Sequence, residues 1–169
     1  MRYRVLAYPT ESCYGLGCDP RSRLSVKRIL QLKRRPQSKG LILIASKPEQ
    51  LARYVTRDGL QAAIALGYWP GAVTLLLPVS KLCPVWLRGK HQTIAVRVTA
   101  HAPAARLCQQ LGMALVSTSA NRSGQRALRS AREVHRVFGR QLSVMPGRIG
   151  NAKRPTKIVD LMTAKVVRA

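Results

Sequence analysis

Short apolar runs alternate with helix-like segments along almost the whole chain, and this alternation limits the fold more than any other feature of the sequence. The runs predict strands at residues 5–8, 41–44, 73–77, 93–98, 114–117 and 158–161. Most of these runs are continuously apolar, which is typical of strands covered on both faces of a sheet. The chain has 169 residues, an ordinary size for one domain. We therefore expect a single α/β domain over 1–169, built on one twisted open sheet with flanking helices.

Two of the segments between the strands begin with a capping box, in which a serine and a glutamate side chain satisfy backbone groups of the first turn. These boxes run from Ser46 to Glu49 and from Ser130 to Glu133. A third segment carries a helical stripe that ends on a lysine instead of an apolar residue. The stripe consists of Val26, Ile29, Leu30 and Lys33. All three segments are predicted to be helices.

The charge balance narrows the function, because 30 Lys and Arg stand against 6 Asp and Glu, a formal net charge of +24. Such a balance points to anionic partners, among them nucleotides and nucleic acids. The acids are scattered along the sequence at Glu11, Asp19, Glu49, Asp58, Glu133 and Asp160. Catalysis by a cluster of carboxylates is therefore not expected.

The cysteines and the apolar stretches indicate a cytoplasmic protein without a metal site. Cys13, Cys18, Cys83 and Cys108 form no CxxC pair and have no histidine at zinc-ligand spacing. We expect each to be a small buried residue in a reducing compartment. The first apolar stretch stops at Pro9, too early for a signal peptide, and no stretch approaches the length of a membrane span.

The positive charge is concentrated in two parts of the chain. The first part covers one predicted helix and the loop after it, with Arg21, Arg23, Lys27, Arg28, Lys33, Arg34, Arg35 and Lys39. The second part, which we call the arginine series, contains Arg122, Arg126, Arg129, Arg132, Arg136 and Arg140. Two interpretations of the series stay open. It is either a solvated surface or a binding surface for tRNA or double-stranded RNA, whose phosphates would relieve the repulsion between like charges.

Four segments carry small, polar or cationic residues where a purely structural sequence would not. Segment 9–17 follows the first strand with hydroxyls and glycines, where α/β proteins bind ligands, although an ordinary turn has the same composition. Segment 32–40 brings cations around a Pro-Gly turn and could clamp a polyphosphate, but it is not a P-loop. Segment 117–124 offers four hydroxyls and one amide to phosphate or ribose oxygens.

The fourth segment, 93–97, places Arg97 inside an apolar strand. A buried guanidinium needs an anion, because an unpaired buried charge is costly. No acid lies close to Arg97 in the sequence. A ligand carboxylate is therefore a natural candidate for its partner, and the alternative is a structural ion pair with a distant acid such as Asp160.

Six motifs, in chain order, resemble the YrdC-like family: PTESCYGLGCD, LKRRPQSKGLILIA, WPGAVTLLLP, IAVRVT, LVSTSANRSG and RPTKIVD. The resemblance runs from about residue 5 to residue 168 and implies the YrdC-like twisted open sheet with a concave basic surface. It also implies an enzyme that forms L-threonylcarbamoyladenylate from L-threonine, bicarbonate and ATP, with release of pyrophosphate. The product would serve the threonylcarbamoyladenosine modification of tRNA, through a protein complex that transfers the threonylcarbamoyl group. Mg²⁺ would be carried by the substrate ATP, because the chain offers no carboxylate pair.

The resemblance assigns residues to the two ends of an active site. The ATP phosphates would be held by Lys33, Arg35 and Lys39, of which Lys33 and Arg35 would be catalytic. The rest of the nucleotide would be bound by Thr93, Ser117, Ser119, Asn121 and Arg168. Threonine would be bound by Ser12, Arg97 and Thr156, with Arg97 on its carboxylate. The carbamate formed from threonine would attack the α-phosphate, so the protein would supply positioning and positive charge and no nucleophile.

Several positions depart from the family pattern. A helix normally precedes the first strand, whereas Met1 almost reaches that strand here. We therefore expect either that the helix is missing, which would leave one face of the sheet less covered, or that the true start lies upstream. Ser12 and Thr156 replace the usual threonine and serine and keep a hydroxyl, and Ala169 stands where the family has glycine. The alternative function is a non-catalytic module that binds tRNA or double-stranded RNA. The retained cations and hydroxyls of the nucleotide site favour the enzyme, because RNA binding alone does not require them.

Overall fold

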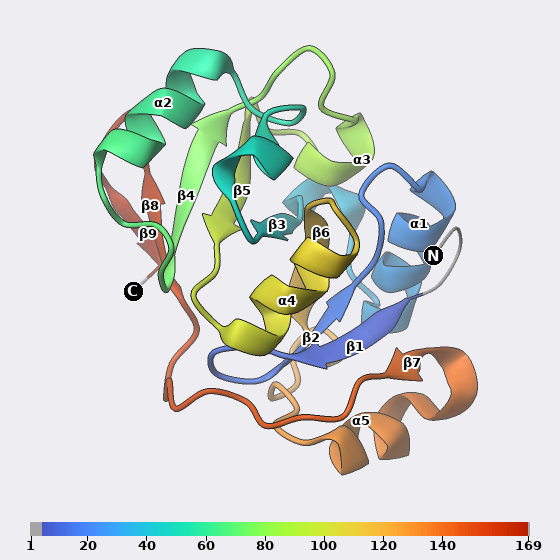
Figure 1. The fold of residues 1–169 in the computed structure, drawn as a ribbon. Coiled ribbons are helices and arrows are strands. Elements are labelled where there is room, and N and C mark those ends of the chain that lie inside the picture. The colour runs from blue at the N-terminus through green and yellow to red at the C-terminus, as the bar shows by residue number, and fades with distance from the viewer. Residues whose placement is uncertain (1–4, 169) are drawn as a thin grey trace.

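A nine-stranded mixed sheet organises the part of the chain that the computed structural model describes, residues 5–168 (Figure 1). The strands are β1 (Leu6–Pro9), β2 (Tyr14–Gly17), β3 (Ile42–Ala45), β4 (Val73–Pro78), β5 (Thr93–Val98), β6 (Leu115–Ser119), β7 (Ser143–Val144), β8 (Lys157–Asp160) and β9 (Val166–Arg168). Their order across the sheet is β7-β1-β2-β6-β3-β5-β4-β8-β9. Met1 and Ala169, on which the two expectations about the chain ends rest, lie outside the described residues.

Helices flank this sheet and confirm the predicted α/β fold (Figure 1). They are α1 (Arg23–Lys33), α2 (Arg57–Ala65), α3 (Val85–Arg88), α4 (Ala102–Gln110) and α5 (Ala131–Phe138). Short 3₁₀ turns, η1 (Gln37–Lys39), η2 (Pro48–Leu51) and η3 (Gly139–Gln141), complete the connections. Within residues 5–168, no helix has the length and apolar character that a membrane crossing requires.

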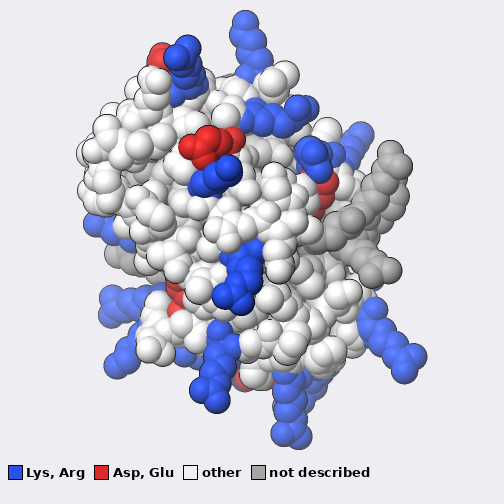
Figure 2. Space-filling model, viewed as in Figure 1, with Lys and Arg blue, Asp and Glu red and all other residues white. Residues whose placement is uncertain are grey.

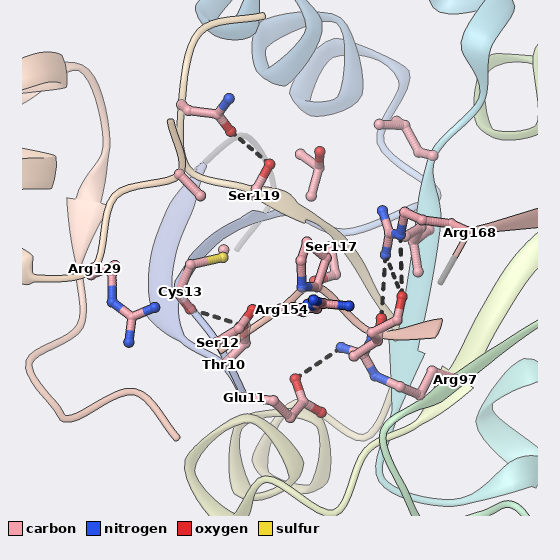
Figure 3. A pocket seen from close by; sticks show the side chains of 18 of the residues that line it. Thr10, Glu11, Ser12, Cys13, Arg97, Ser117, Ser119, Arg129, Arg154 and Arg168 are labelled. Atoms are coloured by element: carbon pink, nitrogen blue, oxygen red, sulfur yellow. Dashed lines mark hydrogen bonds and ion pairs between the residues drawn. The ribbon is translucent and has the colours of Figure 1, made fainter. Parts of the chain in front are cut away.

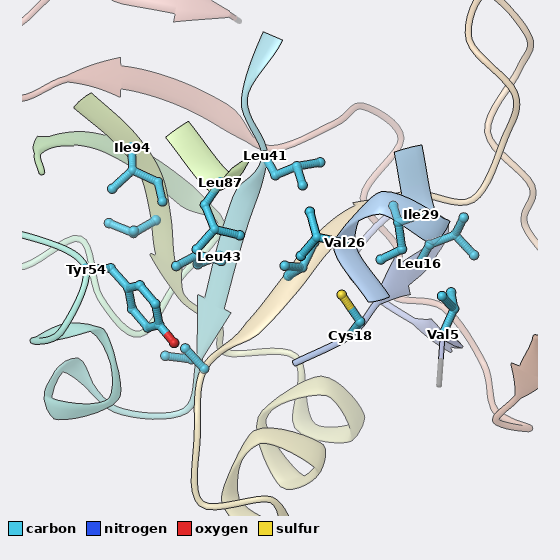
Figure 4. Packing of buried hydrophobic residues seen from close by; sticks show 14 of the residues in the cluster. Val5, Leu16, Cys18, Val26, Ile29, Leu41, Leu43, Tyr54, Leu87 and Ile94 are labelled. Atoms are coloured by element: carbon cyan, nitrogen blue, oxygen red, sulfur yellow. The ribbon is translucent and has the colours of Figure 1, made fainter. Parts of the chain in front are cut away.

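The central strands are buried on both faces, as their continuous apolar sequence predicts. In β3, Leu43 and Ile44 are both fully buried, and successive side chains of a strand point to opposite faces. Leu43 belongs to the large cluster that also contains Ile29 of α1 (Figure 4). Ile44 belongs to a smaller cluster with Leu107 of α4. Helices α1 and α4 therefore cover opposite faces of the sheet.

The six predicted strands are all present, with ends shifted by at most two residues, and β5 has the predicted bounds. The sequence pattern does not predict β2, β7 or β9. Strand β2 lies in the segment whose glycines resemble a turn, yet it pairs antiparallel with both β1 and β6. A Cβ at Gly17 would lie 2.7 Å from the ring of Tyr8 and 2.7 Å from the carbonyl oxygen of Val116. Glycine at this position therefore permits close packing within the sheet and does not mark a turn.

One of the two predicted capping boxes is confirmed. At the start of α5, the backbone N–H of Glu133 donates to Ser130 Oγ at 3.2 Å, and the Glu133 carboxylate accepts from the Ser130 N–H at 3.3 Å. The box at Ser46 is wrong. A short 3₁₀ turn replaces the predicted helix, and the backbone N–H and hydroxyl of Ser46 both donate to Gln50 Oε1, at 2.9 and 3.1 Å. Gln50 thus takes the place predicted for Glu49.

Candidate functional site

A pocket of about 360 Å³ opens where the ends of several strands meet (Figure 3). Its walls come from the β1–β2 turn, from β6 with the loop after it, from the segment before β8, and from single side chains of β5 and β9. Six lining residues are cationic: Arg35, Arg97, Arg129, Lys153, Arg154 and Arg168. Glu11 is the only acid that lines the pocket in the described part of the chain. The pocket therefore suits a small anionic ligand.

Arg97 is buried in the pocket wall, with 5% of its surface exposed. Its Nη2 donates to Glu11 Oε2 at 3.1 Å, and its Nη1 donates to Thr156 Oγ1 at 2.7 Å and Thr74 Oγ1 at 3.2 Å. Thr99 Oγ1 donates to the other oxygen of Glu11 at 2.6 Å. The acid that partners Arg97 therefore comes from 86 residues away in the sequence. The buried Nε–H of Arg97 has no hydrogen-bond partner within residues 5–168.

Thr156 connects Arg97 to Arg168. Arg168 donates from Nη2 to the Thr156 carbonyl oxygen at 2.7 Å and from Nε at 3.2 Å. Burial lowers the pKa of Arg168, and the neighbouring charge of Arg97 lowers it further. Ser12 lines the same pocket from the β1–β2 turn. The structure thus brings together Ser12, Arg97 and Thr156, the three residues predicted to bind threonine.

Lys33 lies beneath the loop that follows β6, with 3% of its surface exposed. Its ammonium donates to the carbonyl oxygens of Ser119 and Asn121, the latter at 3.0 Å, and to Asn121 Oδ1 at 3.3 Å. Burial lowers the pKa of Lys33 to about 8, and the charge of Arg35 adds to this effect. The stripe correctly predicts that this lysine is buried. Its ammonium, however, anchors the loop, and Lys33 is not among the residues that line the pocket.

The other predicted phosphate and nucleotide residues are divided between the pocket and its surroundings. Arg35 lines the pocket and donates from Nη2 to the carbonyl oxygens of Gly40 at 3.1 Å and Lys39 at 3.4 Å. Lys39 is exposed on η1, and Thr93 is half-buried at the start of β5. Neither Lys39 nor Thr93 lines the pocket. The three cations predicted to form one clamp therefore have different environments. The Lys33 ammonium binds the loop after β6, Arg35 lines the pocket, and Lys39 is exposed.

Ser117, Ser119 and Asn121 line the pocket, as predicted, from β6 and the loop after it. The hydroxyl of Ser119 donates to Asn121 Oδ1 at 2.6 Å. The amide of Asn121 donates to the carbonyl oxygens of Arg122 at 2.9 Å and Gln125 at 2.7 Å. These bonds hold the polar side chains of the loop in one arrangement beside the pocket.

Four charged lining residues escape the sequence-based assignment: Glu11, Arg129, Lys153 and Arg154. Glu11 and Arg154 lie inside two of the six motifs, which is the signal that could have identified them. Arg129 belongs by spacing to the arginine series, but the structure places it in the pocket wall.

Arg132 and Arg136 share a face of α5, as predicted, and both are exposed. Figure 2 shows Lys and Arg side chains projecting from many parts of the face it displays, with few acids among them.

The cysteines fit the prediction of buried residues with one difference. Cys18, Cys83 and Cys108 are buried, whereas Cys13 is half-buried and lines the pocket. Burial raises the pKa of the Cys13 thiol. Over residues 5–168, the structure contains no group of three His, Cys, Asp or Glu side chains that could hold a metal ion.

Comparison with known proteins places this chain in a family. A family model for Sua5, YciO and YrdC proteins, described as "Telomere recombination", matches residues 2–169. The chain belongs to the Sua5/YciO/YrdC family. Within it, the threonylcarbamoyl-AMP synthase of Methylobacillus flagellatus is 52% identical over 167 residues, covering 97% of this chain and 92% of that protein. The threonylcarbamoyl-AMP synthase of Thiobacillus denitrificans is 49% identical over 166 residues, covering 98% and 88%.

A solved structure of the Sua5/YciO/YrdC family shares the fold. The crystal structure of P. abyssi Sua5 in complex with L-threonine matches with a TM-score of 0.88 and 31% sequence identity. The match covers 98% of this chain and 50% of the Sua5 chain. This chain thus corresponds to about half of that longer protein.

Proposed function

We propose that this chain is a threonylcarbamoyl-AMP synthase, which forms L-threonylcarbamoyladenylate and pyrophosphate from L-threonine, bicarbonate and ATP. One observation carries the proposal: a single pocket joins a buried arginine, Arg97, to a polar loop at Ser119 and Asn121. The first suits a carboxylate, and the second suits the oxygens of a nucleotide. Relatives with this name are 52% and 49% identical over nearly the whole chain, and a Sua5 relative has been crystallised with L-threonine.

Threonine binds, in this proposal, at the end of the pocket formed by Ser12, Arg97 and Thr156. Its carboxylate lies beside the Arg97 guanidinium, forming a charge-assisted pair. Glu11 keeps the guanidinium oriented, because it binds Nη2 while Thr99 fixes the carboxylate of Glu11 itself. The threonine carboxylate therefore meets an arginine that is already in position.

ATP occupies the remainder of the pocket. Arg35 holds its phosphates, and Ser117, Ser119, Asn121 and Arg168 hold its other oxygens. Lys39 and Thr93 lie outside the pocket lining, so they meet only parts of ATP that extend beyond it. Lys33 acts as a positioning residue, because its ammonium fixes the backbone of Ser119 and Asn121. Mg²⁺ enters with ATP, coordinated by phosphates and water. The pocket offers it no free acid in the described residues, since Glu11 is bound by Arg97 and Thr99.

The chemistry needs no protein nucleophile. The amine of threonine forms a C–N bond to the carbon of CO₂ and loses a proton, giving a carbamate. When bicarbonate is the donor, its C–OH bond breaks and the hydroxyl leaves as water with the amine proton. A carbamate oxygen then forms a bond to the α-phosphorus while the bond to the β-phosphate oxygen breaks, and the electron pair leaves with pyrophosphate. A pocket with many cations and one neutralised acid stabilises the negative charge of the carbamate and of the ATP phosphates throughout this step.

We further propose that the adenylate is consumed in the cytoplasm by a protein complex that transfers its threonylcarbamoyl group to tRNA. The exposed Arg132 and Arg136 on α5 support a contact with tRNA or double-stranded RNA, because neither has a partner among residues 5–168. Phosphate groups would reduce the repulsion between these two arginines.

Incubation of the purified chain with ATP, L-threonine and bicarbonate tests the proposal through release of pyrophosphate. We expect release to depend on threonine and on bicarbonate. Folded protein that releases no pyrophosphate, beside an active relative as control, would leave the RNA-binding module as the better reading.

A further inference from the structure

Three cations of the pocket have no partner within the described residues: Arg129, Lys153 and Arg154. The remaining three, Arg35, Arg97 and Arg168, each donate to protein oxygens. Glu11 does not compensate the unpartnered cations, because Arg97 and Thr99 already bind its two oxygens. The pocket therefore holds positive charge that the protein itself leaves unpaired.

We infer that Arg129, Lys153 and Arg154 bind the pyrophosphate portion of ATP and hold the pyrophosphate that leaves. This inference rests on the proposed function. It names three residues to which the family resemblance assigns no substrate. Arginine and lysine are the side chains suited to a multiply charged phosphate group, arginine through paired bonds and lysine as a point charge. Figure 3 shows Arg129 and Arg154 approaching the pocket from different segments of the chain.

The backbone that carries Lys153 and Arg154 is fixed on both sides. Before them, the N–H of Ala152 donates to the Glu11 carbonyl oxygen at 3.1 Å. After them, the carbonyl oxygen of Thr156 accepts from Arg168 at 2.7 Å. Lys153 and Arg154, which are exposed where they line the pocket, therefore project from a short span with anchored ends. This anchoring reduces the entropy lost when an anion binds.

Arg129 is placed by the start of α5. Its backbone N–H donates to Glu133 Oε2 at 2.6 Å, and the preceding residue, Leu128, is buried. The other oxygen of Glu133 accepts from Arg126 at 2.7 Å, so this carboxylate is occupied and leaves the Arg129 guanidinium unpaired. The confirmed capping box thus fixes the backbone of Arg129 without neutralising its side chain.

The volume of the pocket favours a small polyanion over RNA. At about 360 Å³, it falls within the range of small-molecule sites, about 300 to 1,000 Å³. A nucleic acid duplex cannot enter a cavity of this size. The exposed arginines of α5 remain the candidates for RNA, and the three unpartnered cations belong to the pocket.

Single substitutions with matched controls test the assignment. Arg129→Met is compared with Arg132→Met, an exposed arginine three residues later, and Arg154→Met with Arg148→Met, an exposed arginine of the same connecting segment. Neither control residue lines the pocket, and all four variants lose the same charge. The probe is inorganic pyrophosphate, titrated into each folded variant by calorimetry. We expect Kd to rise about ten- to a hundredfold for Arg129→Met and Arg154→Met, and less than about twofold for the controls.

A kinetic measurement separates binding from folding. In the synthase assay, the pocket variants should raise the KM for ATP and weaken inhibition by pyrophosphate, while the KM for threonine and the thermal midpoint stay unchanged. Unchanged pyrophosphate affinity, equal losses in variants and controls, or a loss of RNA binding alone would overturn the assignment. If the wild-type chain binds pyrophosphate through these residues but shows no threonine-dependent activity, the proposed function fails and the anion site stands.

Discussion

Replacement of Lys33 by methionine should separate activity from stability. The change removes the ammonium and keeps most of the side-chain volume. It takes away the donor to the carbonyl oxygens of Ser119 and Asn121, which carry the polar groups of the nucleotide end. We expect kcat/KM for ATP to fall about ten- to a hundredfold, because the loop that would bind ATP is no longer held in position.

The effect on stability should be small, because two contributions oppose each other. The pKa of Lys33 falls from 10.5 to about 8 on burial. At about 1.4 kcal/mol for each pKa unit, this depression means that the fold disfavours the ammonium by about 3 kcal/mol. Methionine removes that cost but leaves loop oxygens without a donor, at about 1 to 3 kcal/mol. The free energy of unfolding at pH 7 should therefore change by less than about 2 kcal/mol.

Denaturation curves and ATP kinetics of Lys33→Met, with the exposed Lys27→Met of the same helix as control, measure both quantities. The pH dependence has a definite sign. Below about pH 8, the wild type bears the full cost of burying the Lys33 ammonium. As pH rises from about 8 toward 10.5, Lys33 is neutral in the folded protein and still charged in the unfolded chain, so this cost is lost. The wild type should therefore gain stability relative to Lys33→Met across that interval. A loss of more than about 4 kcal/mol at pH 7, or unchanged kcat/KM for ATP, would refute the reasoning.

Three further variants test other parts of the structure. Arg97→Lys should raise the KM for threonine about ten- to a hundredfold more than the KM for ATP, because lysine keeps the charge beside Glu11 but loses the paired donors; equal increases in steady-state assays would contradict this. The double change Arg132→Gln and Arg136→Gln should make the salt dependence of tRNA binding less steep, by about 0.7 to 0.9 in slope for each lost phosphate contact, without altering adenylate synthesis. An unchanged slope in filter binding would mean a solvated face. Ser130→Ala should cost about 1 kcal/mol of stability in denaturant titrations, through loss of the cap on α5.

Periodicity predicts the fold well where one local rule is sufficient. The apolar strand over residues 93–98 has the observed bounds, and the Ser130 capping box forms as predicted, because both depend on neighbouring residues alone. Strand β2 escapes prediction because its glycines are selected by a distant contact. The ring of Tyr8 and the backbone of Val116 leave no space for a side chain at Gly17. A local sequence pattern does not contain the contact with Val116.

The candidate site shows the same division. Burial of Arg97 follows from its apolar strand, but its partner Glu11 comes from 86 residues away and is found only in three dimensions. The direction of Lys33 is likewise set by carbonyl oxygens of a loop 86 and 88 residues later. Spacing groups Arg129 with Arg132, whereas the chain path before α5 turns Arg129 to the pocket. Motifs thus identify only part of the pocket lining, and long-range packing decides what each side chain contacts.

Mass spectrometry of the reaction product tests the central claim most directly. The chain is incubated with ATP, L-threonine and carbon-13-labelled bicarbonate, and the nucleotide products are separated at once because the adenylate is unstable. We predict a threonylcarbamoyl-AMP that carries the label, in amounts equal to the pyrophosphate released, and no such product from Arg97→Ala. Pyrophosphate release without a labelled adenylate, or an unlabelled one, would contradict the proposed synthesis in this pocket.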